Sequence, residues 1–133
     1  MLESKLDYEE LHAVAIGTGP GSYTGIRLSC AVAQGIAFAQ GLKAITLSSL
    51  ELLSMEANIK TSASSIVAIS EANLGNIYIV ETTFLDGAME SSFRFIPWQS
   101  LELNQFAEEC IFIGDGCSLF SDIVNQLPDS SPR

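Results

Sequence analysis

Basic residues are scarce in this sequence. Its 133 residues include 6 Lys and Arg against 16 Asp and Glu, which gives a formal net charge of -10. Lys and Arg provide the sequence-independent affinity of proteins for nucleic-acid phosphates and for anionic membranes. A chain this acidic is therefore not expected to bind RNA, DNA or an anionic bilayer on its own.

Histidine and cysteine are also scarce. The one histidine, His12, has no convergent cluster of carboxylates beside it in the sequence, so we expect no metal site. The cysteines Cys30, Cys110 and Cys117 are odd in number and have no paired spacing. This usage is typical of reduced thiols in a cytoplasmic protein.

Long hydrophobic runs and a secretion signal are missing as well. The most apolar run, residues 28–42, is interrupted by Gln34 and Gln40 and is shorter than the ~20 residues of a membrane-spanning helix. The first twelve residues are acidic and lack the pattern of a signal peptide. We therefore expect a soluble, cytoplasmic protein without a membrane segment.

What the chain does have is enough apolar residues for a core, since 47% of them are hydrophobic. A chain of this length can bury roughly 70% of the surface that it exposes when unfolded. The pattern in residues 1–60 predicts, in order, a strand at 13–16, a glycine loop, a helix from Ser22 or Thr24 to Gln40, a strand at 43–47 and a helix from about 49 to 57. Gly41 can end the long helix, and Ser48 with Glu51 forms a capping box before the next one.

The second half of the chain has a different pattern. It predicts strands at 66–70, 77–84 and 90–96, a helix at 100–109, a strand at 110–113 and a helix at 118–126. The turn Asn73–Asn76 and the hairpin signal Asp86–Gly87 separate the first three strands. The polar segment 58–65 is the expected linker, so we predict lobes at 1–60 and 61–127, followed by a disordered tail at 128–133.

The loop GTGPGSYTG, residues 17–25, is similar to a phosphate-binding loop but fails each specific test. A Walker loop needs a lysine, and there is none between Lys5 and Lys43. A dinucleotide fingerprint would need glycine at Ser22, and a nucleophile elbow around Ser22 would need glycines at Pro20 and Thr24. The loop chemistry alone favours a tight turn between a strand and a helix.

The helix after this loop has little polar surface. Small residues recur every four positions, and these are Gly25, Ser29, Ala33, Ala37 and Gly41. The only charged residue between Glu10 and Lys43 is Arg27. Such a helix is normally covered on two sides. One side would pack on its own sheet, and the other on a further part of the fold or on another protein.

Residues 13–53 closely resemble the TsaB (YeaZ) family. The family pattern G-P-G-S-[FY]-T-G-x-R matches Gly19 to Arg27, and its A-Q-G-[LIV]-A matches Ala33 to Ala37. The family turn D-A-R-x-x-E-V-Y is matched only weakly, by EANLGNIY at 71–78. The resemblance implies an α/β protein of the actin-like ATPase (ASKHA, ribonuclease H-like) fold, with an N-terminally truncated first lobe and a small second lobe.

The resemblance also implies a function. TsaB-type proteins are non-catalytic scaffolds of the complex that makes N6-threonylcarbamoyladenosine beside the anticodon of tRNA, and they pair with a TsaD-type transferase and a TsaE-type ATPase. ATP or ADP and the metal are then expected on those partners, tRNA is contacted only through the complex, and a homodimer is a further candidate. TsaD-type enzymes carry an H-x-x-x-H pair where this chain has SSLELLSMEA, at 48–57, so a glycoprotease (M22) activity is not supported.

Two sets of site residues follow from the motif and the resemblance. The remnant of the nucleotide-side loop comprises Gly19, Pro20, Gly21, Ser22, Tyr23, Thr24 and Gly25. The predicted partner interface comprises Gly25, Arg27, Ser29, Ala33, Gln34 and Ala37. Tyr23 and Arg27 are expected near the partner or near a nucleotide at the shared interface, although Arg27 also fits a solvated helix residue. Asp115 is expected to be a loop acid that caps the next helix.

One departure from the family is large, because members begin with three strands and a helix that would precede residue 13. We therefore predict an exposed sheet edge beside the strand at 13–16. The missing strands imply either a shortened chain or strands supplied by a partner or a swapped copy. Two rival functions remain, which are a fragment of an active ASKHA kinase or ATPase and a self-associating module with no role in tRNA modification.

Overall fold

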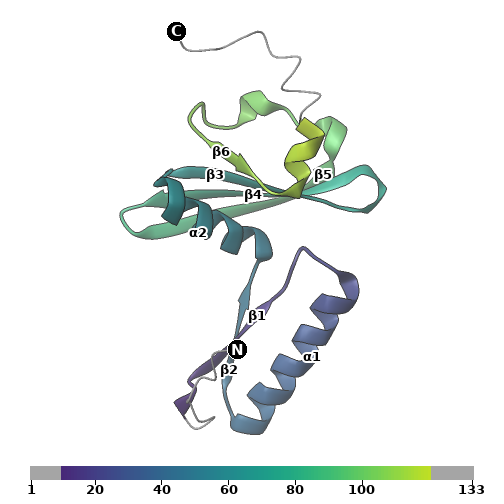
Figure 1. Cartoon of the computed structure of the whole chain (residues 1–133), viewed down its shortest axis with the longest axis vertical. Coiled ribbons are helices and arrows are strands. Elements are labelled where there is room, and N and C mark those ends of the chain that lie inside the picture. The colour runs from purple at the N-terminus through teal and green to yellow at the C-terminus, as the bar shows by residue number, and fades with distance from the viewer. Residues whose placement is uncertain (1–9, 121–133) are drawn as a thin grey trace. The chain divides into compact units, whose positions relative to one another are not determined.

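Two parallel strands joined by a long helix form the first part of the chain. The computed structural model describes residues 10–120, in which β1 (Ala13–Gly17), α1 (Tyr23–Gln40) and β2 (Lys43–Leu47) follow one another. The strands pair in parallel, from Ala13 opposite Lys43 to Gly17 opposite Leu47. A helix is the usual connection between parallel neighbours. The predicted strand–helix–strand order is therefore confirmed (Figure 1).

Capping residues set the ends of α1. The side chain of Ser22 accepts a hydrogen bond from the backbone N–H of Gly25 at 3.4 Å. Gly41 adopts a left-handed conformation with φ of 63° and donates its N–H to the carbonyl of Ala37. Glycine adopts left-handed backbone with less strain than any other residue, so α1 ends at the position that the sequence predicted.

The second part of the chain is built on a four-stranded mixed sheet. Its elements are α2 (Ser49–Thr61), β3 (Ser65–Glu71), β4 (Asn76–Leu85), β5 (Ala88–Pro97) and β6 (Ile111–Ile113). The strand order is β5-β4-β3-β6, with β3 antiparallel to β4, β4 antiparallel to β5, and β6 parallel to β3. The predicted meander of three strands is therefore confirmed.

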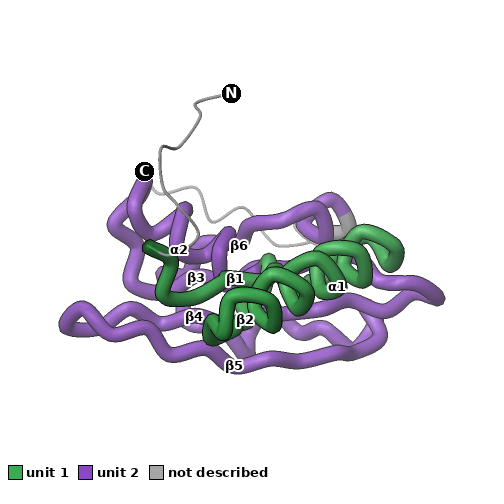
Figure 2. Tube along the Cα trace, turned by 90° about the horizontal axis from the view of Figure 1, so that it is seen from below, with its two compact units in different colours: residues 1–49 green, residues 50–133 purple. Residues whose placement is uncertain are grey.

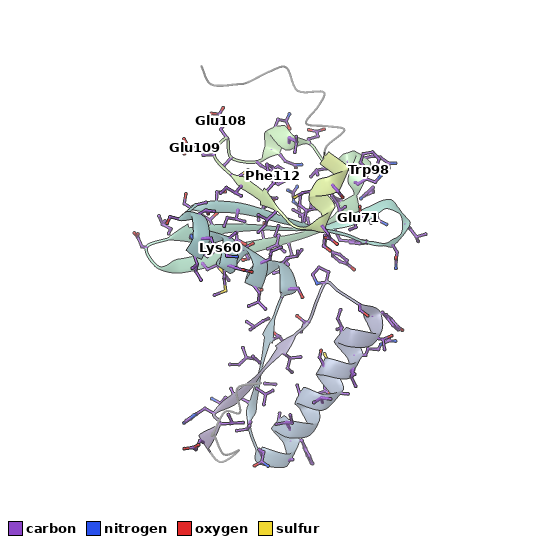
Figure 3. The ribbon with its side chains drawn as sticks, viewed as in Figure 1. Lys60, Glu71, Trp98, Glu108, Glu109 and Phe112 are labelled. Atoms are coloured by element: carbon purple, nitrogen blue, oxygen red, sulfur yellow. The ribbon has the colours of Figure 1, made fainter. Side chains whose placement is uncertain are left out.

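Apolar side chains cover both faces of this sheet. On one face, Val67, Ile69, Ile77 and Ile79 pack with Leu101 and Phe106 from the segment after β5, and on the other face Ala68 and Val80 pack with Leu50 of α2. Side chains alternate between the faces along each strand, so both sets come from the same two strands. Figure 3 shows Trp98 and Phe112 on the side of the sheet away from Lys60, which lies on α2.

The chain divides into two compact units between Ser49 and Leu50 (Figure 2). The sequence placed the corresponding boundary at 60/61, with a linker at 58–65. The structure differs because α2 continues to Thr61 and its buried residue Leu50 packs on the sheet of the second unit. The second helix therefore belongs to unit 2 rather than to the first lobe.

The helix predicted at 100–109 is wrong. The structure has two short 3₁₀ turns there, Trp98–Ser100 and Leu103–Gln105. The buried residues of this segment, Leu101 and Phe106, are five positions apart, a spacing that places them on different sides of an α-helix. Extended backbone between the turns lets both side chains reach the same core.

The last predicted elements are only partly described. Residues Asp115–Phe120 form a 3₁₀ helix, which begins before the helix predicted at 118–126. The rest of that helix and the predicted tail at 128–133 lie outside the described residues.

The predicted open edge beside β1 is confirmed for the described part of the chain. Between residues 10 and 120, β1 pairs only with β2, in a sheet of two strands. A sheet of two strands buries little on its own. Among the described residues of unit 1, β1 thus has a strand on one side only.

Candidate partner-binding surface

The glycine loop is held against the end of β2. The carbonyl of Gly19 accepts a hydrogen bond from the N–H of Ser49 at 2.8 Å, and the N–H of Thr18 donates to the carbonyl of Leu47 at 2.9 Å. Gly19 has a φ of 92°, and a Cβ atom there would lie 2.6 Å from Cδ1 of Ile26. Glycine suits this position because the left-handed backbone strains any other residue, and a Cβ atom would also require the end of the Ile26 side chain to move.

The remaining residues of the loop make the turn into α1. Gly19 is buried and Pro20 half-buried, with a cis peptide bond between them, and the five residues from Gly21 to Gly25 are exposed. The hydroxyl of Ser22 caps the helix, and its backbone carbonyl accepts a hydrogen bond from the N–H of Ile26 at 2.8 Å. In the structure the loop is thus a tight turn between a strand and a helix, and its nucleotide-side role stays a prediction.

One face of α1 is turned inward. Ile26, Cys30, Ala33 and Ala37 follow the spacing of a single helix face, and each is buried or half-buried. The elements that contact α1 most are β1 and β2. Ala33 is the most buried residue of the helix, with 6% of its surface exposed. This face therefore packs on the sheet of unit 1.

The opposite face of α1 is apolar and exposed. Leu28 and Val32, one turn apart, expose 64% and 54% of their surfaces. Beside them runs a row of exposed small residues, Ala31, Gly35 and Ala39. A Cβ atom added at Gly35 would meet no atom within 4 Å. Large apolar side chains beside small ones form the kind of surface on which another helix can pack closely.

A polar row lies next to this apolar face. The guanidinium of Arg27 lies 3.5 Å from the centre of the Tyr23 ring, in a cation–π contact. Gln34 follows Tyr23 by eleven residues and therefore lies on the same side of the helix. Phe38, one turn further, exposes 91% of its surface. The structure thus brings together Tyr23, Arg27 and Gln34 from the two predicted sets.

The other predicted interface residues lie elsewhere on α1. Gly25 and Ser29 are exposed, and the Ser29 hydroxyl donates to the carbonyl of Ile26 at 2.9 Å. Ala33 and Ala37 do not lie on the exposed face, because a step of four residues turns the helix by about 40° beyond a full circle. A row that repeats every four residues therefore winds from the exposed side to the sheet.

The exposed row Ala31, Gly35 and Ala39 was missed by this reasoning. A signal for it was present in the sequence. Leu28 and Val32 are large and lie beside this row, whereas Ile26 and Cys30 continue into Ala33 and Ala37. Comparing the two sets at a period of 3.6 residues would have separated the inward face from the outward one.

Other predicted features are less informative for a site. The carboxylate of Asp115 accepts from the N–H of Gly116 at 3.0 Å, and Asp115 is itself the first residue of the 3₁₀ helix Asp115–Phe120 rather than a loop residue before a helix at 118–126. His12 is exposed, and within residues 10–120 no three His, Cys, Asp or Glu side chains gather where they could hold a metal ion. In the same part of the chain, neither α-helix is long and apolar enough to cross a membrane.

The architecture places the protein in a fold class. YeaZ from Pseudomonas aeruginosa has a similar structure, with a TM-score of 0.78 and 25% sequence identity over 93% of this chain and 58% of that chain. The protein therefore has the α/β architecture of the actin-like (ASKHA) fold, over part of the length of that neighbour. This agrees with the fold expected from the GPGSYTG motif.

Sequence comparison shows the family. Residues 1–94 match the family model "TsaD: tRNA N6-adenosine threonylcarbamoyltransferase". The tRNA threonylcarbamoyladenosine biosynthesis protein TsaB of Haemophilus influenzae is 27% identical over 138 residues, which cover 95% of this chain and 58% of that protein. TsaB of Bacillus subtilis is 26% identical over 126 residues, covering 90% and 53%. The chain belongs to this family, and within it to the TsaB (YeaZ) group. It spans somewhat more than half the length of these relatives.

Proposed function

We propose that the chain takes part in the biosynthesis of N6-threonylcarbamoyladenosine in tRNA, as a non-catalytic subunit that pairs with a TsaD-type transferase through the exposed face of α1. The names of its relatives indicate the pathway. The observation that best supports the pairing is the outward apolar face around Leu28, Val32 and Gly35, which is exposed in the described part of unit 1.

The chemistry of α1 suits a protein partner. Interfaces typically combine an apolar centre with a polar rim, and Tyr and Arg are frequent among the residues that contribute most to binding. Leu28 and Val32 would form the centre, and Tyr23, Arg27 and Gln34 the rim. The cation–π contact holds the Arg27 side chain over Tyr23, so less side-chain freedom would be lost on binding. The open space at Gly35 would let the backbone of a partner helix approach.

The same proposal assigns the chemistry to the partners. ATP or ADP and the metal would be bound by the TsaD-type transferase and the TsaE-type ATPase, and this chain would supply no catalytic group. Tyr23 and Arg27 would lie at the margin of the shared interface, where they could contact a nucleotide held by the transferase. Because the chain carries a net charge of -10, tRNA would be contacted only through the assembled complex in the cytoplasm.

Complementation tests the proposed pathway. The chain would be produced in cells depleted of their own TsaB, and the N6-threonylcarbamoyladenosine content of total tRNA would be measured by mass spectrometry of nucleosides. We expect the modified nucleoside to return. Unmodified tRNA in cells that accumulate folded chain would overturn the proposal. Hydrolysis of ATP by the isolated chain would instead favour a fragment of an active ASKHA enzyme.

A further inference from the structure

We propose that β5 is a self-association strand, through which two copies of this chain pair antiparallel, with Ser92 of one copy opposite Ser92 of the other. The proposal goes beyond the role in tRNA modification and does not depend on it, because it concerns unit 2 and not α1. Three features of β5 carry it, which are its position in the sheet, its backbone and its side-chain pattern.

The first feature is the position of β5 at the margin of the sheet. The strand order is β5-β4-β3-β6, and Figure 2 shows β5 outermost in unit 2. Its ten residues pair with β4 in one continuous register, from Ala88 opposite Leu85 to Pro97 opposite Asn76. Edge strands are usually protected by bulges, prolines, short length or charged side chains, and β5 carries two charged residues of opposite sign, Glu90 and Arg94. This strand is long and regular, and its one proline is the last residue.

The second feature is the set of backbone groups that point away from β4. Phe84 donates its N–H to the carbonyl of Ser64, so its backbone faces β3. The backbone N–H and C=O groups of successive residues point to opposite sides of a strand. The odd-numbered residues of β4 therefore bond to the even-numbered residues of β5 that lie opposite them. The N–H and C=O groups of Met89, Ser91, Phe93 and Phe95 therefore point to the outer edge of β5.

The turn of the hairpin agrees with this assignment. Asp86 and Gly87 both have positive φ, of 50° and 77°, which is the signature of a two-residue type I′ turn. Such a turn is closed by a hydrogen-bonded pair, here Leu85 with Ala88. Within residues 10–120, the only strand that pairs with β5 is β4. No other strand of this described part pairs with the outward groups of these four residues.

The third feature is a side-chain pattern that is complementary to itself. On one face of β5, Met89, Phe93 and Phe95 expose 38%, 58% and 56% of their surfaces. The other face carries Glu90 and Arg94, which have opposite charge and lie symmetrically about Ser92. An antiparallel pair of identical strands joins each residue to one at an equal distance on the other side of the symmetry axis.

A two-fold axis at Ser92 gives favourable side-chain pairs on both faces of β5. It places Glu90 opposite Arg94 of the second copy, which is a favourable cross-strand pair. It places Met89 opposite Phe95 of the second copy, where a thioether meets an aromatic ring. The outward backbone groups of Met89, Ser91, Phe93 and Phe95 then meet their counterparts in about eight hydrogen bonds.

Neighbouring registers are poorer. An axis at Phe93 would place Glu90 opposite Ile96, and an axis at Ser91 would place Arg94 opposite Ala88. An axis at Glu90 or at Arg94 would place like charges opposite each other, which is destabilising. The register at Ser92 is therefore the one that the sequence of β5 favours.

Two properties of the chain limit the strength of the association. Nη2 of Arg94 already lies 2.6 Å from Oε1 of Glu81, and its Nη1 donates to Oε1 of Gln105 at 2.7 Å. The second copy's Glu90 would therefore join a cluster of polar side chains that is already formed. Each copy carries a net charge of -10, which opposes the approach of the two. We therefore expect a dimer that forms as the protein concentration is raised and dissociates on dilution.

Sedimentation velocity and cysteine cross-linking test the proposal. The wild-type chain should shift from monomer to dimer across a concentration series. In the proposed register, the two copies of Ser92 form a pair without backbone hydrogen bonds, with Cα atoms about 4.5 Å apart, which is within the range of a disulfide. Ser92→Cys should therefore give a disulfide-linked dimer on mild oxidation, and the matched control Glu90→Cys should not.

Peptide mass spectrometry would locate the cross-link, since Cys30, Cys110 and Cys117 are also present. Ser91→Pro should abolish the dimer, because it removes an outward N–H without removing a bond to β4. Circular dichroism would verify that it folds, and it should still bind a TsaD-type transferase if the proposed function holds. A wild-type chain that stays monomeric at every concentration, or Glu90→Cys linking as readily as Ser92→Cys, would overturn the proposal.

Discussion

Replacing Gly35 by alanine should stabilise the isolated chain. Gly35 lies inside the 18-residue helix α1, where glycine is less favourable than alanine by about 0.5–1 kcal/mol. A Cβ atom at this position would meet no atom within 4 Å, so the substitution introduces no clash. The free energy of unfolding of unit 1 should rise by that amount. Urea denaturation followed by circular dichroism at 222 nm measures the change.

Gly41→Ala is the matched control. Gly41 also has no atom within 4 Å of its added Cβ, but its φ is 63°. Alanine is strained in left-handed backbone, so this variant should lose about 1 kcal/mol. The two substitutions are the same chemically and differ only in backbone conformation. A loss of stability in Gly35→Ala, or a shift of the same sign in both variants, would refute the assignment of Gly35 to an open helix face.

Two further predictions concern unit 2. Gly114→Ala should destabilise unit 2 by roughly 3 kcal/mol or more, because the added Cβ would lie 2.1 Å from the carbonyl oxygen of Ile69 and the φ of Gly114 is 107°. The midpoint of urea unfolding, followed by Trp98 fluorescence, should therefore fall. An unchanged midpoint would contradict the packing of this loop. Burial raises the pKa of the Cys110 and Cys117 thiols, with the charge of Glu81 adding to it at Cys110 and that of Asp115 at Cys117. Stability should therefore fall as the pH rises above about 8.5, where the thiols of the unfolded chain ionise first, and a variant with alanine at both positions should show a smaller fall.

The elements with local signals were predictable from the sequence. Gly41 ended α1, and Asp86–Gly87 turned β4 into β5, because each glycine adopts a backbone conformation that few other residues accept. The glycine loop was predicted as a tight turn for the same reason. The motif Gly19 to Arg27 was specific enough to identify the family as well.

The errors arose where contacts between segments distant in the sequence determine the local conformation or which helix face is buried. Residues 100–109 have a helical pattern, but Leu101 and Phe106 reach the core of the sheet only from extended backbone. Ala33 was placed on a partner surface because small residues recur every four positions, whereas the turn of the helix carries that row onto the sheet of unit 1. The spacing of small residues alone did not distinguish the two faces of α1.

The central claim is that the exposed face of α1 binds a TsaD-type transferase. The most direct test compares Val32→Glu with Ile45→Glu by size exclusion with light scattering in the presence of the transferase. Both residues are aliphatic, lie in unit 1 and expose about half of their surface, 54% and 50%, but only Val32 lies on α1. The account predicts that the wild type and Ile45→Glu co-elute with the transferase and that folded Val32→Glu does not. Co-elution of Val32→Glu as complete as that of the wild type would contradict it.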